Sequence, residues 1–236
     1  MGRKILRSYG ADRNATERLR VYYTIEETRS SVDASAANND RALEAQLVAR
    51  AQLGQEDALR RLVDLHKDRL YAFIWRMIHN HHDAEEICQD AFLKAFASLQ
   101  SFSTEYRFST WLFTIGYRVC LNRMRRKRVF TGEVEFGSIE DKSDARDLAS
   151  LESEEATRLK ETVWSAVDRL SPPQRAAVLL FYRNTMGCRE IARVLDLPVA
   201  TVKSHLHRAR GRLRELLTAL PEQEVEQFRN RSGLAG

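Results

Sequence analysis

Apolar side chains recur every three or four residues in two long blocks of this chain, a period that restricts both blocks to amphipathic helices. The stripe of the first block consists of Leu59, Leu62, Val63, His66, Leu70, Phe73, Ile74 and Met77. The stripe of the second block consists of Val202, Leu206, Ala209, Leu213 and Leu216. Only 10 Gly and 4 Pro occur among 236 residues, which leaves few turns to separate short strands. We therefore expect an all-α protein built from two small helical domains.

Charge is distributed unevenly along the chain. Residues 107–128 contain seven Lys and Arg and no acid, and residues 199–214 contain five, together with two His and again no acid. Between these blocks, residues 133–155 hold nine acids and two bases. Two basic helical blocks separated by an acidic segment predict two polyanion-binding modules on one chain.

These patterns divide the chain into five parts. The expected parts are a mobile N-terminal tail (1–40), a first helical domain (41–128), a flexible acidic linker (129–158), a second helical domain (159–220) and a polar tail (221–236). The linker assignment rests on its acidic composition and its lack of an apolar face.

Membrane, metal and cofactor sites are not expected. No apolar run reaches the roughly 20 residues that a membrane span needs, and the N-terminus lacks the apolar stretch of a secretory signal. We therefore expect a cytoplasmic protein without membrane contact. Cys88, Cys120 and Cys188 do not have the spacing of a zinc site and are expected to be buried thiols.

The second basic block has the pattern of a helix-turn-helix. Residues 187–195 predict a short helix, residues 196–198 a tight turn, and Val199 begins a longer helix. The apolar stripe would hold this longer helix on its scaffold and leave its polar side chains exposed to phosphates and base edges. These polar residues are Thr201, Lys203, Ser204, His205, His207, Arg208, Arg210 and Arg212. A solvated basic face is the alternative, but the absence of any acid from residues 199–214 favours DNA binding.

Two helix starts are marked by capping residues. Asp83, with Glu86 three residues later, is expected to open a helix as a capping box, after a break at residues 79–82. Ser171 before Pro172 gives a second start, because proline suits the first helical position.

Aromatic and basic side chains alternate in and after the loop that begins at Ser101. The residues concerned are Phe102, Tyr106, Arg107, Phe108 and Trp111. Exposed rings beside a cationic groove can stack on unpaired bases, a contact worth about 1–3 kcal/mol per base. Packing in the core is the alternative for Phe108 and Trp111, and Trp111 lies in line with Ile115 and Val119.

Both blocks resemble one protein family. Residues 170–216, and above all the run Pro-Val-Ala-Thr-Val-Lys-Ser-His-Leu-His-Arg-Ala-Arg at 198–210, resemble the promoter −35 reader of extracytoplasmic-function (ECF) sigma factors of the sigma-70 family. Response regulators share part of this run. Residues 83–128 resemble the −10 domain (region 2) of the same family, with Arg118 at a position where asparagine is common and Asn122 retained one turn later.

The resemblance implies a sigma factor that reads −35 and −10 promoter elements, traps a base flipped out of the melted −10 strand and catalyses nothing. It implies docking on the clamp coiled coil of the largest subunit of core RNA polymerase by Asp83, Glu86, Gln89, Asp90 and Phe92. It implies −10 contacts by Phe102, Tyr106, Arg107, Phe108, Arg118, Asn122, Arg123, Arg125 and Arg126. It implies −35 contacts by Thr201, Lys203, Ser204, His205, His207, Arg208 and Arg210. The flap of the second polymerase subunit and an anti-sigma protein are further expected partners, and no catalytic residue, metal or cofactor is expected.

Two other functions compete with this interpretation. A stand-alone helix-turn-helix repressor or activator would need a receiver, ligand-binding or dimerisation domain upstream, and the first block has no such pattern. The run His81-His82-Asp83 superficially suits a metal phosphohydrolase, but His66 and His79 are the only nearby additional ligands.

Overall fold

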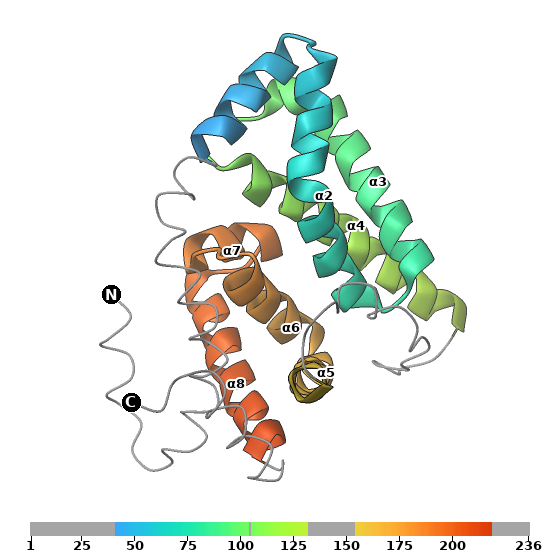
Figure 1. Ribbon diagram of the computed structural model, residues 1–236, viewed down its shortest axis with the longest axis vertical. Coiled ribbons are helices and arrows are strands. Elements are labelled where there is room, and N and C mark those ends of the chain that lie inside the picture. Colours follow the sequence, from blue (N-terminus) through green and yellow to red (C-terminus); the bar gives the residue numbers. More distant parts are fainter. Residues whose placement is uncertain (1–40, 104, 132–153, 219–236) are drawn as a thin grey trace.

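In the part of the chain that the structure describes, all regular secondary structure is helical (Figure 1). The computed structural model describes residues 41–103, 105–131 and 154–218. Helix 41–52 comes first, followed by α2 (Glu56–Ile78), α3 (His81–Ala97), η3 (Leu99–Ser101), α4 (Phe108–Thr131), α5 (Glu154–Asp168), α6 (Pro172–Val178), η4 (Leu179–Arg183), α7 (Cys188–Leu195) and α8 (Val199–Thr218). We name residues 41–131 the N-terminal unit and residues 154–218 the C-terminal unit. The predicted all-α class is confirmed.

The N-terminal unit is built on the packing of α2, α3 and α4 against one another. Six residues of the predicted stripe on α2 are buried: Leu62, His66, Leu70, Phe73, Ile74 and Met77. Gly116 allows α4 to approach α2 closely, because a Cβ atom there would lie 2.9 Å from Cδ1 of Leu70. The apolar period of the sequence thus specifies the core of this unit.

The break between α2 and α3 is shorter than the sequence predicts. His79 ends α2 in the left-handed region (φ 57°), and α3 begins at His81. The expected start at Asp83 is wrong, because the side chain of Asn80 accepts a hydrogen bond from the Asp83 N–H at 2.8 Å and so caps the helix. Glu86 therefore does not form a capping box with Asp83.

The C-terminal unit contains the predicted helix-turn-helix. Helix α6 starts at Pro172 after Ser171, as expected, and continues into the π-helical turn η4. Asp196 ends α7 in the left-handed region (φ 55°). Helix α8 buries one side against α5, α6 and α7, and the buried residues on that side are Val202, Leu206, Ala209, Leu213 and Leu217.

The segment between helices α4 and α5 is shorter than the linker that the sequence predicts, residues 129–158. Helix α4 extends to Thr131 and α5 begins at Glu154, so helix replaces the expected flexible chain at both ends. The predicted tails 1–40 and 221–236 and the middle of the linker lie outside the described residues.

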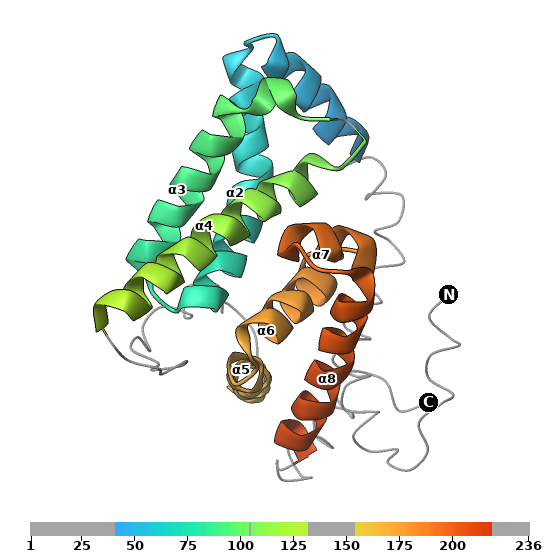
Figure 2. The ribbon, with the colours of Figure 1, turned by 180° about the vertical axis from the view of Figure 1, so that it is seen from behind.

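The two units lie against each other (Figures 1 and 2). Helix α7 packs on α4 and α6 packs on α2. In both views α8 lies on the side of the C-terminal unit that is farther from α2, α3 and α4. None of the described helices is long and apolar enough to cross a bilayer.

Candidate nucleic-acid and polymerase interface

Helix α8 presents a basic surface opposite its buried stripe. Lys203, Ser204, His207 and Arg208 are exposed, and Thr201 and His205 are half-buried. The two positions 203 and 204 are followed one turn later by 207 and 208, so these four side chains share one face. A helix with adjacent donors of this kind fits the major groove of DNA.

Two of the predicted −35 residues have additional interactions within the C-terminal unit. Burial, and secondarily the charge of Arg208, lowers the pKa of His205, which favours the neutral imidazole at physiological pH. Nε of Arg210 donates to the hydroxyl of Tyr182 at 2.7 Å, and the guanidinium lies near the rings of Phe181 and Tyr182. Arg210 therefore also braces α8 against η4.

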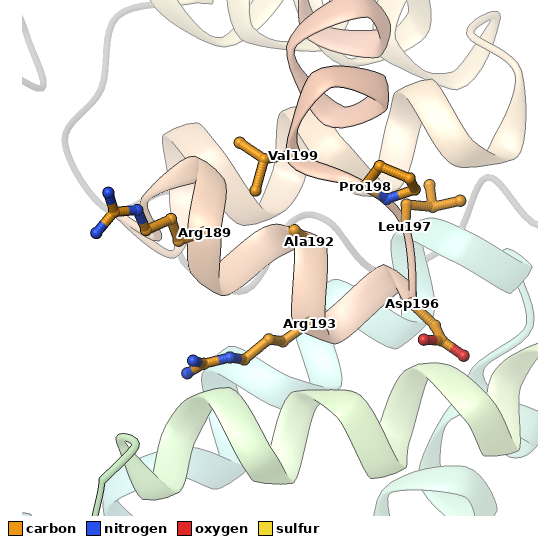
Figure 3. Close-up of a pocket in the computed structure, with 7 residues that line it drawn as sticks. All are labelled: Arg189, Ala192, Arg193, Asp196, Leu197, Pro198 and Val199. Atoms are coloured by element: carbon orange, nitrogen blue, oxygen red, sulfur yellow. The ribbon is translucent and has the colours of Figure 1, made fainter.

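The turn between α7 and α8 borders a shallow pocket (Figure 3). Its lining consists of Arg189, Ala192, Arg193, Asp196, Leu197, Pro198 and Val199. Arg189 and Arg193 leave α7 in different directions, and Arg193 extends along α4 of the N-terminal unit. The guanidinium carbon of Arg193 lies 3.4 Å from the ring centroid of Tyr106.

The aromatic loop is partly a packed cluster. Phe108 is only 1% exposed, so the expectation that it contacts DNA is not compatible with this structure; its ring packs edge-on against Phe102 and Trp111. Phe102 and Trp111 are half-buried, with centroids 5.0 Å apart. Tyr106 is 39% exposed and is the most accessible ring of the set.

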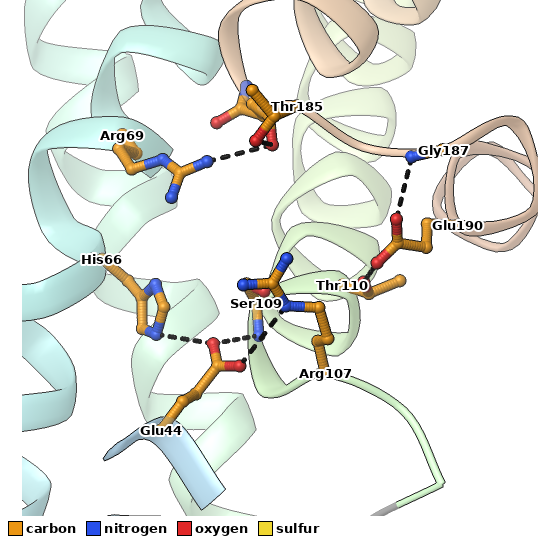
Figure 4. Close-up of polar contacts among 10 residues, drawn as sticks. Glu44, His66, Arg69, Arg107, Ser109, Thr110, Thr185, Gly187 and Glu190 are labelled. Carbon is orange, nitrogen blue, oxygen red and sulfur yellow. Dashed lines mark hydrogen bonds and ion pairs between the residues drawn. The ribbon is translucent and has the colours of Figure 1, made fainter. Parts of the chain in front are cut away.

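A buried polar network holds the end of this loop (Figure 4). Glu44 is 3% exposed; its Oε1 accepts from the Ser109 N–H at 2.9 Å and lies 3.0 Å from Nε2 of His66. Nε of Arg107 lies 3.8 Å from Oε2 of Glu44, which ties this expected DNA contact to the scaffold. Burial would raise the pKa of Glu44, but His66, the Ser109 N–H and Arg107 outweigh it and leave that pKa lowered.

Sequence reasoning missed Glu44. A signal for it exists, because Glu44 precedes the buried Leu47 and Val48 by three and four residues and so lies on the inner face of helix 41–52.

Helix α4 carries a polar stripe beyond the loop. Arg118, Asn122, Arg125 and Arg126 are exposed and spaced by four, three and one residues, which aligns them on one side. Arg123 differs from these, because it pairs with Glu86 and, at 3.2 Å, with Oδ1 of Asp83. Its guanidinium joins α4 to α3.

The outer face of α3 combines acids with an exposed apolar side chain. Glu86, Gln89 and Asp90 are exposed, and Leu93 is 67% exposed. Phe92 is 8% exposed and belongs to the core, so its expected place in a docking surface is not compatible with this structure. Leu93, one residue later, is the apolar residue on the solvent side of this helix, and sequence reasoning did not single it out.

The side chains of the proposed phosphohydrolase motif have other partners. Nδ1 of His81 lies 2.6 Å from the hydroxyl of Tyr71, and Asp83 pairs with Arg123. Across the described part of the chain, no three His, Cys, Asp or Glu side chains are grouped so as to hold a metal ion. The geometry therefore gives no support to the phosphohydrolase alternative.

The sequence matches two parts of one family. The family profile described as Sigma-70 region 2 matches residues 62–129, and the profile described as Sigma-70, region 4 matches residues 160–213. The ECF RNA polymerase sigma factor SigW of Bacillus subtilis is 31% identical over 179 residues, covering 73% of this chain and 96% of SigW. The chain belongs to the ECF sigma factors of the sigma-70 family. It is thus an alternative sigma factor that directs promoter-specific transcription, and nothing in the comparisons supports a stand-alone regulator.

Further sequence relatives and solved structures support the same family assignment. The RNA polymerase sigma-H factor of Pseudomonas aeruginosa is 30% identical, with 74% of this chain and 94% of that protein covered. Among solved structures, CnrH in complex with the cytosolic domain of CnrY is 26% identical with a TM-score of 0.56, covering 76% of this chain and 99% of CnrH. The sigma factor RpoE of Bartonella quintana, solved with the anti-sigma factor NepR, is 26% identical with a TM-score of 0.57, covering 69% of this chain and 98% of RpoE.

Proposed function

We propose that this sigma factor binds core RNA polymerase through the outer face of α3 and reads the promoter with two separate surfaces. The exposed face of α8 contacts the −35 element, and Tyr106 together with the polar stripe of α4 contacts the −10 element. The observation that carries the proposal is the pair of cationic helices, α4 and α8, each with its apolar side buried in a different unit and its donors exposed.

The docking surface is argued from chemistry. Glu86 and Asp90 lie around Leu93 on α3, so the surface offers an apolar centre with an acidic rim. A basic, amphipathic partner helix complements such a surface, and the clamp coiled coil of the largest polymerase subunit is the proposed partner. The C-terminal unit is proposed to bind the flap of the second subunit.

Opening of the −10 element is proposed to follow from capture of a single strand. The accessible ring of Tyr106 can stack on an unpaired base, and Arg118 and Arg125 can contact the adjacent phosphates. Trapping the separated strand shifts the equilibrium between duplex and melted DNA. This scheme needs no catalytic residue of the sigma factor itself.

The proposed cellular setting follows from these partners. Because core polymerase and the chromosome lie in the cytoplasm of a bacterium, we place the protein there. An anti-sigma protein is a further proposed partner, since one structural relative was solved with such a factor.

Run-off transcription tests the proposal. The full chain is added to purified core polymerase with a genomic library as template, and the 5′ ends of the transcripts are sequenced. We expect transcripts that share a −35 and a −10 motif and that are absent without the chain. A chain that gives no promoter-specific transcript unless another sigma factor is present would overturn the proposal.

A further inference from the structure

Helix α4 begins at an arginine instead of a capping residue. The carbonyl oxygen of Arg107 accepts the first hydrogen bond of the helix, from the Trp111 N–H at 3.2 Å, so Arg107 occupies the N-cap position. Ser, Thr, Asp and Asn are preferred there, because their side-chain oxygens accept from the second or third N–H of the helix. A guanidinium has only donors, and its positive charge is disfavoured at the positive end of a helix dipole. The stability of α4 alone therefore does not account for an arginine at this position.

Glu44 supplies the missing cap from another helix (Figure 4). Its Oε1 accepts from the N–H of Ser109, the second residue of α4, at 2.9 Å. Nε2 of His66, on α2, lies 3.0 Å from the same oxygen. Because Glu44 is only 3% exposed, its carboxylate cannot touch DNA. It can act on DNA only through the residues that it holds.

The guanidinium of Arg107 is held at one of its nitrogens. Nε lies 3.8 Å from Oε2 of Glu44, and Figure 4 shows the guanidinium beside the carboxylate. Nε is buried, whereas the side chain as a whole is 29% exposed. Because the donors of a guanidinium have fixed directions, a contact at Nε also sets where the two Nη groups point. These Nη groups remain for other acceptors.

Arg107 also extends the polar stripe of α4. Arg118 follows it by 11 residues and Arg125 by 18, which are about three and five helical turns. At a rise of 1.5 Å per residue, the three positions are spaced by about 16 Å and about 10 Å along one side of the helix. A row of cations next to exposed aromatic rings is a surface that binds single-stranded nucleic acid. Arg107 is the member of this row that directly follows the exposed ring of Tyr106.

We propose that Glu44 is a positioning residue for promoter opening, which holds Arg107 so that its two Nη groups bind a backbone phosphate of the separated −10 strand. This role rests on the proposed function of Tyr106 and α4 in capturing that strand. Charge alone predicts the opposite effect of Glu44, because removal of an anion near bound DNA strengthens binding to phosphates. The sign of the effect therefore separates positioning from charge.

Binding of forked DNA by the full chain in complex with core polymerase tests this role. The fork carries a duplex −35 region and a single-stranded −10 segment from a promoter that the chain transcribes, and fluorescence anisotropy gives the affinity at several salt concentrations. Arg107→Ala should weaken binding about tenfold, as expected for one charge-assisted hydrogen bond. It should also reduce the slope of log affinity against log salt by about 0.7, as expected for one phosphate of a single strand.

Glu44→Gln should show the same two losses, although it removes a negative charge and keeps an acceptor for the Ser109 N–H. The double variant Glu44→Gln/Arg107→Ala should bind no more weakly than Arg107→Ala, because both changes remove one contact. Arg107→Lys should not restore the affinity of the parent, since a single ammonium replaces the separate Nε and Nη donors.

Two control variants account for charge and for stability. Glu56→Gln makes the same change at an exposed position of α2, outside the contacts of Glu44, and should bind the fork as the parent does. Ile87→Val removes one buried methyl group from the core of the same unit. It should lower stability and leave both the affinity and the salt slope unchanged.

The outcomes distinguish the role of Glu44 from the function of the loop. Equal or tighter binding by Glu44→Gln, or weaker binding with an unchanged salt slope, overturns the positioning role. Full affinity of Arg107→Ala or of Arg107→Lys also overturns it. Each of these results leaves the proposed function in place as long as Tyr106→Ala binds the fork more weakly than the parent. If Tyr106→Ala and Arg107→Ala both bind normally, the proposed function of the loop fails together with the role of Glu44.

Discussion

Individual side chains differ in reactivity because of where the fold places them. Cys88 is 9% and Cys120 0% exposed, whereas Cys188, at the start of α7, is partly exposed. Burial, and secondarily the charge of Glu85, raises the pKa of the Cys88 thiol to about 12. Burial, and secondarily Cys88, raises the pKa of Cys120 to about 12. Since the thiolate is the reactive form, the two buried thiols should be inert at neutral pH.

Alkylation checks this difference. With iodoacetamide at pH 8, we expect modification of Cys188 and protection of Cys88 and Cys120 in the native protein, and modification of all three in urea. Peptide mass spectrometry identifies the modified residues. Rapid native modification of Cys120 would contradict the described core.

Glu44 contributes stability through its buried contacts. Replacing it by Gln keeps the size of the side chain and removes the charge that faces His66 and Arg107. We expect the free energy of unfolding to fall by about 1–3 kcal/mol at pH 7, measured by urea denaturation. Because the pKa of Glu44 is lowered in the folded state, this contribution is present above its ordinary pKa and is lost as the pH falls through the folded value. The two proteins should therefore converge in stability in acid, and a difference that grows in acid would count against the assignment.

At the scale of the helices, two glycines affect stability for different reasons. Gly116 allows close packing of two helices, whereas Gly211 only lowers the helix propensity of α8. Gly116→Val should lower the free energy of unfolding by about 1–3 kcal/mol, because the new side chain overlaps Leu70 in the core. Gly211→Ala, on the exposed side of α8 with open space around it, should raise it by about 0.5–1 kcal/mol. Urea denaturation of both variants is the measurement, and equal effects of the same sign would refute the packing of α4 on α2.

The helix α3 offers a second test at this scale. Asp90→Arg reverses a charge on its exposed face, which should weaken binding of core polymerase by about 1–2 kcal/mol if the partner helix is basic. Asp64→Arg on α2, also at an exposed aspartate, is the matched control and should bind normally. Fluorescence anisotropy with labelled sigma factor measures both, and unchanged binding of Asp90→Arg would remove α3 from the docking surface.

Local patterns in the sequence were enough to predict the individual helices. The stripes of α2 and α8 and the start at Pro172 depend only on residues within a few turns of one another. Phe108 and Phe92 were misassigned because a pattern of aromatics does not reveal which ring faces the core. The start of α3 was misplaced because Asn80 is as good a cap as Asp83. The junction between the units escaped prediction, since Arg76 and Asp168 are 92 residues apart and no local period links them.

At the scale of the whole molecule, the two surfaces proposed to read the promoter lie on different units. Helix α8 belongs to the C-terminal unit, and Tyr106 and the polar stripe of α4 belong to the N-terminal unit. Sites that are far apart and share no partner contribute additively to binding. Loss of a −35 contact and loss of a −10 contact should therefore act independently and at different steps of initiation.

Two variants of the full chain, bound to core polymerase on a promoter identified by 5′-end sequencing, test this separation. Arg208→Ala should weaken binding to the −35 element by about 1–3 kcal/mol if it makes a bidentate base contact. Arg169→Ala, at an exposed arginine of the same unit outside α8, should bind as the parent does. Tyr106→Ala should leave the −35 footprint unchanged and reduce the permanganate reactivity of −10 thymines, because it removes a stacked base worth about 1–3 kcal/mol. The double variant should show the sum of the two free-energy losses. A Tyr106→Ala protein that opens DNA normally would show that the accessible ring of this loop does not hold the melted strand.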